Sequence, residues 1–470
     1  MVMGSLREEA EVVVIGAGPG GYVAAIRAAD LGKNVVIVDD KPQLGGTCLL
    51  EGCIPSKTLI NAVELMDHAK EAAQFGLSYT NLSIDENKLR EFTDKVVNGL
   101  SAGINVLLEK RGVEIIHGRA RFESSRALHI EGGEVSGIDF RQAIIATGSR
   151  VAKLPMAEGL PVWYSNKALK LPRIPKEMVV IGGGYIGLEL GLVYAGLGSE
   201  ITVVEFMPHL LTGADEDMTD VVMRRCRKKF KNIMLESKVA AIEYDGSKFK
   251  LKVEKDGKTT EIETDQVLIA VGRKPNTDDL GLEKTKVKVS DRGVIRVTEE
   301  QRTDDPNIFA IGDVTPGPML AHKAAREAKI AAEVIAGHPA AFDNRAIPAV
   351  VFTEPEMAWT GLSETEAKAQ NVTYEVGKFP LKALGRARTI GQTDGFVKIL
   401  FDPKSKLVLG VGIVGAQASE LIAEPTLALE MGATLEDLTV TIHPHPTLSE
   451  SLMEAAEVAS GEAVHILKPK

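Results

Sequence analysis

The sequence predicts an α/β protein in which one supersecondary unit occurs twice and a different α+β unit follows. The repeated unit is an apolar strand, a glycine-rich turn, a helix and a second apolar strand that ends in an acid. In both copies the acid stands 23 positions after the first glycine, from 16 to 39 and from 182 to 205. From residue 346 onward, strands with Gly and Pro punctuation precede helices, and we interpret this part as an α+β unit without a glycine-rich phosphate loop. At roughly 100–200 residues per domain, 470 residues suffice for about three domains.

The composition indicates a globular protein with an acidic surface. The chain is 44% hydrophobic and 26% charged, and its net charge of −10 opposes broad binding to nucleic acids or anionic membranes. The basic run 224–229 is interpreted as the solvated side of a helix, with Cys226 an ordinary thiol. We therefore expect no nucleic-acid partner and no membrane partner.

Three cysteines in a chain this long are too few for a secreted disulfide scaffold. Residues 1–10 contain no apolar core of a secretory signal, and no apolar run approaches the ~18–20 residues that span a bilayer. We expect a cytoplasmic protein. Because Cys48 and Cys53 stand five positions apart, they indicate local chemistry.

The first repeated unit has the pattern of a dinucleotide site. Strand 11–15 leads into Gly16, Gly18 and Gly21, and strand 34–38 ends at Asp39. The first glycine permits a sharp turn, the second admits a pyrophosphate to the backbone, and the third lets helix and strand pack closely. The start of the helix, expected over 22–31, offers N–H groups and a positive dipole end to the phosphates.

The second unit repeats the pattern with Gly182, Gly184, Gly187 and the acid Glu205. A carboxylate accepts hydrogen bonds from a ribose diol and repels a 2′-phosphate. No arginine occurs in residues 206–209, so this site favours NAD over NADP. Two complete units predict two Rossmann-like dinucleotide-binding domains and two cofactors that exchange electrons, FAD and NAD.

Three further apolar strands suggest how the domains are divided. Segments 143–148 and 267–272 each end in glycine, and each is expected to return the chain to the first domain. Strand 307–311 ends at Gly312 and Asp313, where the carboxylate suits a ribityl hydroxyl and a plain turn is the alternative. The predicted divisions are a first FAD-binding part with the cysteine pair (1–150), an NAD-binding domain (151–270), a continuation of the FAD domain (271–345) and an interface domain (346–470).

The segment 45–57 holds both candidate redox cysteines. A spacing of five turns through about 140° on a regular helix, so the two thiols cannot share a face. A distorted first turn would bring them together, and Gly52 and Pro55 supply such irregularity. A metal site and a pair of inert buried thiols are the alternatives. No third and fourth Cys or His ligands stand nearby, and we predict no metal.

Six segments occur in one order: 44–48, 53–57, 146–148, 182–189, 312–313 and 443–450. Together they resemble the pyridine nucleotide–disulfide oxidoreductases over residues 11–461. The resemblance implies bound FAD and NAD, and a C-terminal α+β dimerisation domain after the two Rossmann-like domains. In this family each active site is shared between subunits, so the resemblance implies a homodimer.

The resemblance also assigns roles. Cys48 would exchange disulfides with the substrate, Cys53 would lie against the flavin, and Lys57 would lie near flavin N5. His445 would act as the base, oriented by Glu450 and contributed by the other subunit; a histidine suits this role because the thiolate is the nucleophile. The alternative for His445 is a metal pair with His443.

The resemblance also implies further contacts to the cofactors. The FAD contacts would be Gly16, Gly18, Gly21, Asp39, Gly46, Thr47, Ala120, Thr147, Gly148, Asp313, Met319, Leu320, Ala321 and His322. The NAD contacts would be Gly182, Gly184, Tyr185, Ile186, Gly187, Glu189, Glu205, Val239 and Gly272.

The activity that the resemblance implies is oxidation of protein-bound dihydrolipoamide to lipoamide with reduction of NAD to NADH. The alternatives are a reductase of glutathione, mercuric ion or thioredoxin, and a redox-inactive flavoprotein scaffold. The tail 461–470 lacks a second cysteine pair, which opposes the thioredoxin and mercuric types, and Glu205 opposes the NADP-dependent glutathione type. The implied partners are lipoyl-bearing acyltransferase subunits of 2-oxo acid dehydrogenase complexes, or the lipoyl carrier of glycine cleavage.

Overall fold

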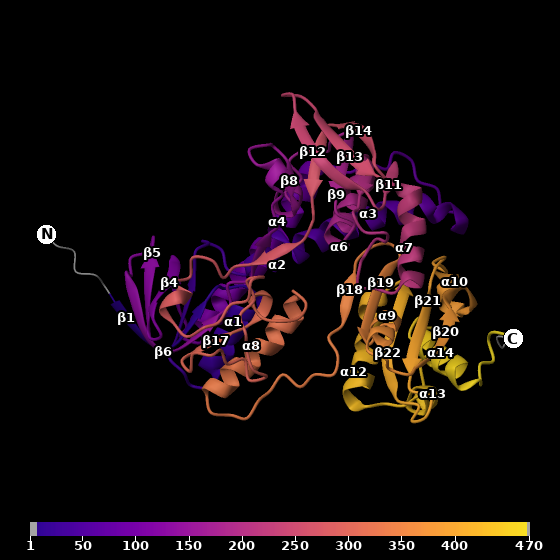
Figure 1. Ribbon diagram of the computed structural model, residues 1–470. Helices are drawn as coiled ribbons and strands as arrows, with labels where there is room; N and C mark the ends of the chain where they lie inside the picture. Colours follow the sequence, from indigo (N-terminus) through magenta and orange to yellow (C-terminus); the bar gives the residue numbers. More distant parts are fainter. Residues whose placement is uncertain (1–6, 468–470) are drawn as a thin grey trace.

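The computed structural model describes residues 7–467 and contains three main sheets, each with its own helices (Figure 1). The first sheet lies at the left of Figure 1, the second at the top and the third at the lower right, where the chain is orange to yellow. The fold agrees with the prediction of two parallel α/β units followed by an α+β unit.

The first sheet is largely parallel, in the order β3-β2-β1-β6, and β6 pairs at its other edge with both β5 and β17. Its elements are β1 (Arg7–Ile15), α1 (Pro19–Asp30), β2 (Val35–Asp39), α2 (Gly46–Glu51), α3 (Cys53–Glu71), α4 (Glu86–Glu109), β3 (Glu114–His117), β4 (Arg119–Ser124), β5 (Ala127–Glu131), β6 (Gly137–Ile145), β17 (Ile308–Ala310) and α8 (Ala321–Ile335). Helices α1, α4 and α8 cover one face, and β4 and β5 pack over the other. Because both faces are covered, residues 12–15 of β1 and 35–38 of β2 are unbroken apolar runs.

The second sheet is wholly parallel, in the order β11-β10-β9-β15-β8. Its elements are β8 (Trp163–Tyr164), α5 (Ser165–Ala168), β9 (Glu177–Ile181), α6 (Tyr185–Gly196), β10 (Glu200–Val204), α7 (Glu216–Lys229), β11 (Asn232–Met234), β12 (Lys238–Tyr244), β13 (Phe249–Lys255), β14 (Lys258–Thr264) and β15 (Gln266–Ile269). Helices α6 and α7 pack on one face, and the antiparallel sheet β12-β13-β14 covers the other.

One strand assignment from the sequence was wrong. The apolar strand expected to return the chain to the first domain at 267–272 is β15, which pairs with β9 and β8 in the second sheet. The return is made by β16 (Arg273–Pro275), which runs antiparallel to β7 (Ser149–Val151). A strand buried on both faces looks the same in either sheet, so its apolar pattern did not identify its partner. The chain thus enters and leaves the second sheet along one two-stranded ribbon.

The third sheet is antiparallel, in the order β18-β19-β22-β21-β20. Its elements are β18 (Ala349–Val351), β19 (Glu356–Gly361), α9 (Glu364–Ala369), β20 (Glu375–Pro380), α10 (Gly385–Thr389), β21 (Phe396–Phe401), β22 (Val408–Gly415), α11 (Ala418–Leu421), α12 (Ala423–Met431), α13 (Leu435–Val440) and α14 (Glu450–Ser460). Helices α12 to α14 contribute to the core on one face, while residues of β18, β19, β21 and β22 join the core around α7.

A buried ammonium group joins the second and third sheets. Lys398 on β21 is 1% exposed, and its Nζ lies 2.7 Å from Asp215, 2.8 Å from Asp217 and 3.0 Å from Glu364. These three carboxylates lie close enough together to hold a metal ion, but the lysine ammonium lies among them. The cluster is therefore an inter-sheet ion network. Within residues 7–467, no helix combines the length and apolar character that a bilayer crossing requires.

Candidate active site

The two candidate redox cysteines lie on either side of a break between α2 and α3. Gly52 forms the break with φ −142° and ψ −110°. A Cβ atom on Gly52 would lie 2.9 Å from the carbonyl oxygen of Thr47, so the close approach requires glycine. The structure thus contains the distortion that the sequence predicted at Gly52. Both cysteines are free thiols, and the Cys48 thiol hydrogen-bonds to the Cys53 sulfur.

The surroundings of the two sulfurs separate their acidities. The hydrogen bond from Cys48 lowers the pKa of Cys53 to about 7, and the Lys57 ammonium acts in the same direction. The same hydrogen bond and burial raise the pKa of Cys48 far above its usual range. Cys53 is also the first residue of α3, where the helix dipole favours a thiolate. Of the two thiols, Cys53 therefore ionises first, while Cys48 keeps its proton.

Lys57 stands one helical turn after Cys53 and is paired with a buried acid. Its Nζ donates to Oε2 of Glu189 at 2.8 Å, and the Glu189 side chain is only 4% exposed. The backbone N–H of Phe352 donates to Oε1 of Glu189 at 3.0 Å. Burial raises the pKa of Glu189, although Lys57 and these hydrogen bonds oppose the rise.

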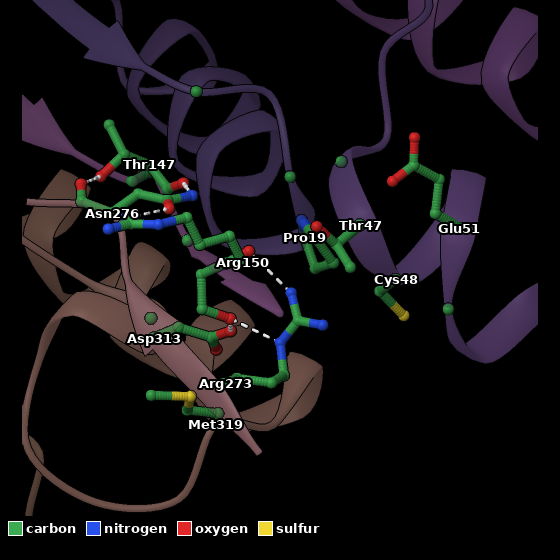
Figure 2. Close-up of a pocket in the computed structure, with 18 of the residues that line it drawn as sticks. Pro19, Thr47, Cys48, Glu51, Thr147, Arg150, Arg273, Asn276, Asp313 and Met319 are labelled. Atoms are coloured by element: carbon green, nitrogen blue, oxygen red, sulfur yellow. Dashed lines mark hydrogen bonds between the residues drawn. The ribbon is translucent and has the colours of Figure 1, made fainter. Parts of the chain in front are cut away.

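A cavity of about 690 Å³ joins the cysteine pair to the first glycine turn. Figure 2 shows Cys48 and Thr47 on one side of this cavity, with Asp313 and Met319 on the other. The cavity brings together most of the residues predicted to contact FAD and some of those predicted to contact NAD. They are Gly16, Gly18, Asp39, Gly46, Thr47, Cys53, Lys57, Ala120, Thr147, Gly148, Tyr185, Ile186, Glu189, Asp313, Met319 and Ala321, and Cys48 lines the same cavity.

The two glycine turns have matching geometry. A Cβ atom on Gly16 or Gly182, the first glycine of each turn, would lie 2.5 or 2.4 Å from a backbone carbonyl oxygen of the neighbouring strand end. A Cβ atom on Gly21 or Gly187, the third glycine, would lie 1.7 or 2.1 Å from the carbonyl oxygen of the first. Each position thus requires glycine for close packing of the backbone.

The residues present fit two dinucleotides. Helices α1 and α6 begin after Gly18 and Gly184 with no side-chain cap, so their first-turn N–H groups remain available to phosphates. The Asp39 carboxylate accepts backbone hydrogen bonds of 2.6 and 2.9 Å from residues 17 and 41. Glu205 accepts equivalent bonds of 2.5 and 2.7 Å from residues 183 and 207. Each acid is therefore fixed beside its own glycine turn, where a ribose would follow the phosphates.

The remaining residues predicted to contact cofactors lie outside the cavity lining. Leu320 precedes α8, and the imidazole Nε2 of His322 in its first turn lies 2.8 Å from the carbonyl oxygen of Pro348. Val239 is 7% exposed in the core between the second sheet and β12-β13-β14. Gly272, with φ +119°, lies just before β16. Gly182, Gly184, Gly187 and Glu205 form the second glycine turn, while Gly21 packs α1 against the first.

The sequence did not single out a polar network between β7, β16 and Asp313. Ser149 donates to Oδ2 of Asp313 at 2.5 Å, and Arg273 donates to Oγ of Ser149 at 2.7 Å and to its carbonyl oxygen at 2.6 Å. Figure 2 shows Arg273 reaching toward Asp313 at the cavity wall. Ser149 and Arg273 each directly follow one of the glycines, Gly148 and Gly272, that ended the predicted strands. The position directly after each of these glycines was the signal in the sequence that could have identified Ser149 and Arg273.

His445 and Glu450 form a pair on the third sheet's side of the molecule. Nδ1 of His445 lies 2.8 Å from Oε1 of Glu450, whose Oε2 accepts the Thr447 N–H at 2.7 Å. Burial opposes ionisation of Glu450, but the Thr447 N–H and His445 hold its pKa below the usual range. The His445 side chain is 77% exposed and does not line the cavity of its own chain. His443 is paired separately with Glu424 at 2.8 Å.

Two glycine turns that fit dinucleotides, with a cysteine pair at the cavity beside the first, form the arrangement of a flavoprotein oxidoreductase. The family described as pyridine nucleotide-disulphide oxidoreductase matches residues 10–328, and its dimerisation domain matches residues 347–456. Dihydrolipoyl dehydrogenases of Geobacillus stearothermophilus and Bacillus subtilis are each 46% identical to this chain, covering 99% and 100% of it and 100% of their own lengths. The solved structure of the HOCl-induced flavoprotein disulfide reductase RclA from Escherichia coli has a TM-score of 0.84 and 27% identity, covering 94% of this chain and 98% of its own.

The chain belongs to the pyridine nucleotide-disulphide oxidoreductase family. Its cofactors are FAD and NAD, and the predictions of fold class, enzyme class and cofactors are confirmed. The dimerisation domain supports a homodimer. The roles of individual site residues stay predictions.

Proposed function

We propose that this protein oxidises dihydrolipoamide carried on partner proteins to lipoamide and reduces NAD to NADH. The observation that carries the assignment is the 46% identity, over essentially the whole chain, to relatives named dihydrolipoyl dehydrogenase. The site supports it because a cysteine pair, the Lys57–Glu189 ion pair and a dinucleotide turn line one cavity.

The reaction is a thiol–disulfide exchange followed by electron transfer. A thiolate of dihydrolipoamide attacks Cys48 in the Cys48–Cys53 disulfide, and Cys53 leaves as a thiolate. The second substrate thiolate then attacks the substrate sulfur of the mixed disulfide, which closes the lipoamide ring and releases Cys48. Two electrons have passed from the substrate to the cysteine pair. Bound FAD supplies the two-electron relay from this pair to NAD, after which the cysteines are again a disulfide.

The chain's own residues suit these steps. Cys53, with its pKa lowered to about 7, is a good leaving group near neutral pH, whereas Cys48 retains a proton when reduced. His445, oriented by Glu450, accepts the proton of the attacking substrate thiol. Because His445 does not line the cavity of its own chain, we assign it to the active site of the second subunit.

The substrate arm belongs to another protein, and we propose two kinds of partner. They are the lipoyl-bearing acyltransferase subunits of 2-oxo acid dehydrogenase complexes and the lipoyl carrier of glycine cleavage. For the location we propose the cytoplasm, with the mitochondrial matrix as the alternative.

The test is steady-state NADH formation by the purified holoenzyme. Dihydrolipoamide with NAD is expected to give a higher kcat/KM than NADPH gives with glutathione disulfide, oxidised thioredoxin or mercuric ion. A clear preference for any of these three acceptors would overturn the assignment. Absence of turnover with all four substrates, despite bound flavin, would favour the scaffold alternative.

A further inference from the structure

Phe352 comes from the dimerisation domain but contacts the redox site. It directly follows β18, and its ring packs against the core around α6 and α7. Its backbone N–H donates to Oε1 of Glu189 at 3.0 Å, and its ring centroid lies 4.3 Å from Nζ of Lys57. One residue of the dimerisation domain thus touches both members of the Lys57–Glu189 pair.

The turn after Phe352 is fixed from two sides. The Glu354 carboxylate lies 2.9 Å from Nε2 of His68 on α3 and accepts a 3.0 Å hydrogen bond from Arg225 on α7. Within the turn, the Thr353 hydroxyl donates to the carbonyl oxygen of Pro355 at 2.7 Å. Because these contacts anchor the turn to both α3 and α7, the Phe352 ring has a defined position relative to Lys57.

The Lys57 ammonium needs a neighbouring group, such as the Phe352 ring, that limits where it can lie. Its side chain is 30% exposed, and a lysine has many rotamers with similar energies. Glu189 binds one side of the ammonium, at 2.8 Å, and the face of the Phe352 ring attracts it through the ring quadrupole. If the ring is removed, the ammonium gains room to turn away from Cys53.

We propose that Phe352 is a positioning residue that holds the Lys57 ammonium beside the Cys53 sulfur, and so couples the dimerisation domain to the redox pair. The inference rests on the proposed function for its catalytic role, but the experiment that tests it does not depend on that function. Phe352 influences the charge on the Cys53 sulfur, and this charge is present in the enzyme without substrate. Loss of the ring leaves less positive charge beside the sulfur and makes the thiolate harder to form.

The experiment titrates Cys53 in the holoenzyme, in a Cys48→Ser background. The only other cysteine, Cys226, is fully buried, and the long-wavelength absorbance of flavin beside a thiolate follows Cys53 as the pH changes. Phe352→Leu is expected to move the titration midpoint upward by on the order of 1 pH unit. Phe352→Met, which also lacks the ring, serves as the second variant and should likewise move the titration midpoint upward.

Two control variants separate this effect from a general loss of packing. Phe352→Tyr keeps the aromatic face and should restore the original midpoint. Phe396→Leu removes another ring of the same sheet that lies under a lysine, with Nζ of Lys378 at 3.6 Å, and should leave the midpoint unchanged. An unchanged midpoint in both ring-free variants, or an equal shift in Phe396→Leu, would overturn the inference. Failure of the unmodified enzyme to oxidise dihydrolipoamide would count against the proposed function alone, because the titration uses no substrate.

Discussion

The charge on the Cys53 sulfur depends on a small number of neighbouring groups. Cys48 donates a hydrogen bond to it, Lys57 places a positive charge near it, and the start of α3 adds a favourable dipole. Glu189 opposes ionisation of the thiol and also holds Lys57 in place. The acidity of one thiol therefore depends on groups from α2, α3 and α6.

The first residue-scale prediction concerns pH. In the reduced enzyme, the Cys53 thiolate should be lost as the pH falls through about 7. Lys57→Met removes the positive charge and should move this midpoint upward by on the order of 1 pH unit. Spectrophotometric titration of the reduced holoenzyme measures it. Lys41→Met is the matched control, because Lys41 pairs with Glu51 on the cavity wall and is expected to leave the midpoint in place.

The second prediction separates the two cysteines. Cys48→Ser should abolish oxidation of dihydrolipoamide, because the introduced hydroxyl cannot form a mixed disulfide with the substrate. The flavin should stay bound and be reduced by NADH, since the glycine turns and Asp313 are unchanged. Absorbance spectra before and after NADH addition, together with a dithiol assay, measure both properties. Near-normal dithiol oxidation would show that the roles are assigned incorrectly.

The third prediction concerns the coenzyme. NAD should be preferred to NADP because the Glu205 carboxylate, fixed by the N–H groups of residues 183 and 207, repels a 2′-phosphate. Glu205→Ala combined with Met207→Arg should shift the preference toward NADP by removing repulsion and adding a phosphate partner. Comparison of kcat/KM for both coenzymes decides the matter, and comparable values in the unmodified enzyme would contradict the assignment.

At the scale of single elements, the junction between α2 and α3 sets the geometry of the redox pair. Gly52→Ala would place a Cβ atom 2.9 Å from the Thr47 carbonyl oxygen, so the junction must shift. We expect a loss of about 1–3 kcal/mol of unfolding free energy and slower re-formation of the Cys48–Cys53 disulfide. Thermal unfolding and the rate of disulfide formation in the reduced protein measure the two effects.

The control for this variant is Gly99→Ala. Gly99 lies exposed within α4, and a Cβ atom there meets nothing within 4 Å. This change should stabilise the protein by roughly 0.5–1 kcal/mol, because glycine is unfavourable in a helix interior. If both substitutions had the same effect, the contact with Thr47 would have no special role.

The elements that the sequence predicted well are those defined by local patterns. Strand, glycine turn, helix and acid follow one another within about 30 residues, so Gly16, Asp39, Gly182 and Glu205 were identifiable together. The strand at 267–272 was misassigned because its partner strand is set by packing far along the chain. Phe352 gave no signal for a similar reason: its neighbours Lys57 and Glu189 are remote in sequence and meet it only after three sheets have packed together.

At the scale of the whole molecule, the cysteine pair and the histidine–glutamate pair belong to separate parts of the fold. In one chain, Cys48 lines the cavity and His445 lies exposed on the dimerisation domain, which is why we propose that His445 acts in the active site of a second subunit. Each dimer would then contain two sites, each built from both chains.

This arrangement predicts complementation. Homodimers of Cys48→Ser should be inactive, and homodimers of His445→Ala should lose activity by at least the ~10²–10⁴ typical of a general acid–base. A mixed dimer places both defects in one site and leaves the other site intact. Unfolding, mixing and refolding the two variants should therefore recover activity, approaching half that of the unmodified dimer for each mixed dimer formed. Verified mixed dimers without activity would mean that both residues act within one chain.

The ribbon of β7 and β16 has a consequence for how such a protein can be altered or can evolve. The chain leaves for the second sheet through β7 and returns through β16, and these strands are paired neighbours. The two ends of the intervening segment therefore meet at one place, as in domains that tolerate grafting into a host. The segment between β7 and β16 could therefore be exchanged for another domain without interrupting a strand of the first sheet. Its covalent connection to the first sheet thus consists of one pair of neighbouring strands, while its noncovalent contacts with the third sheet run through Lys398 and the shared core.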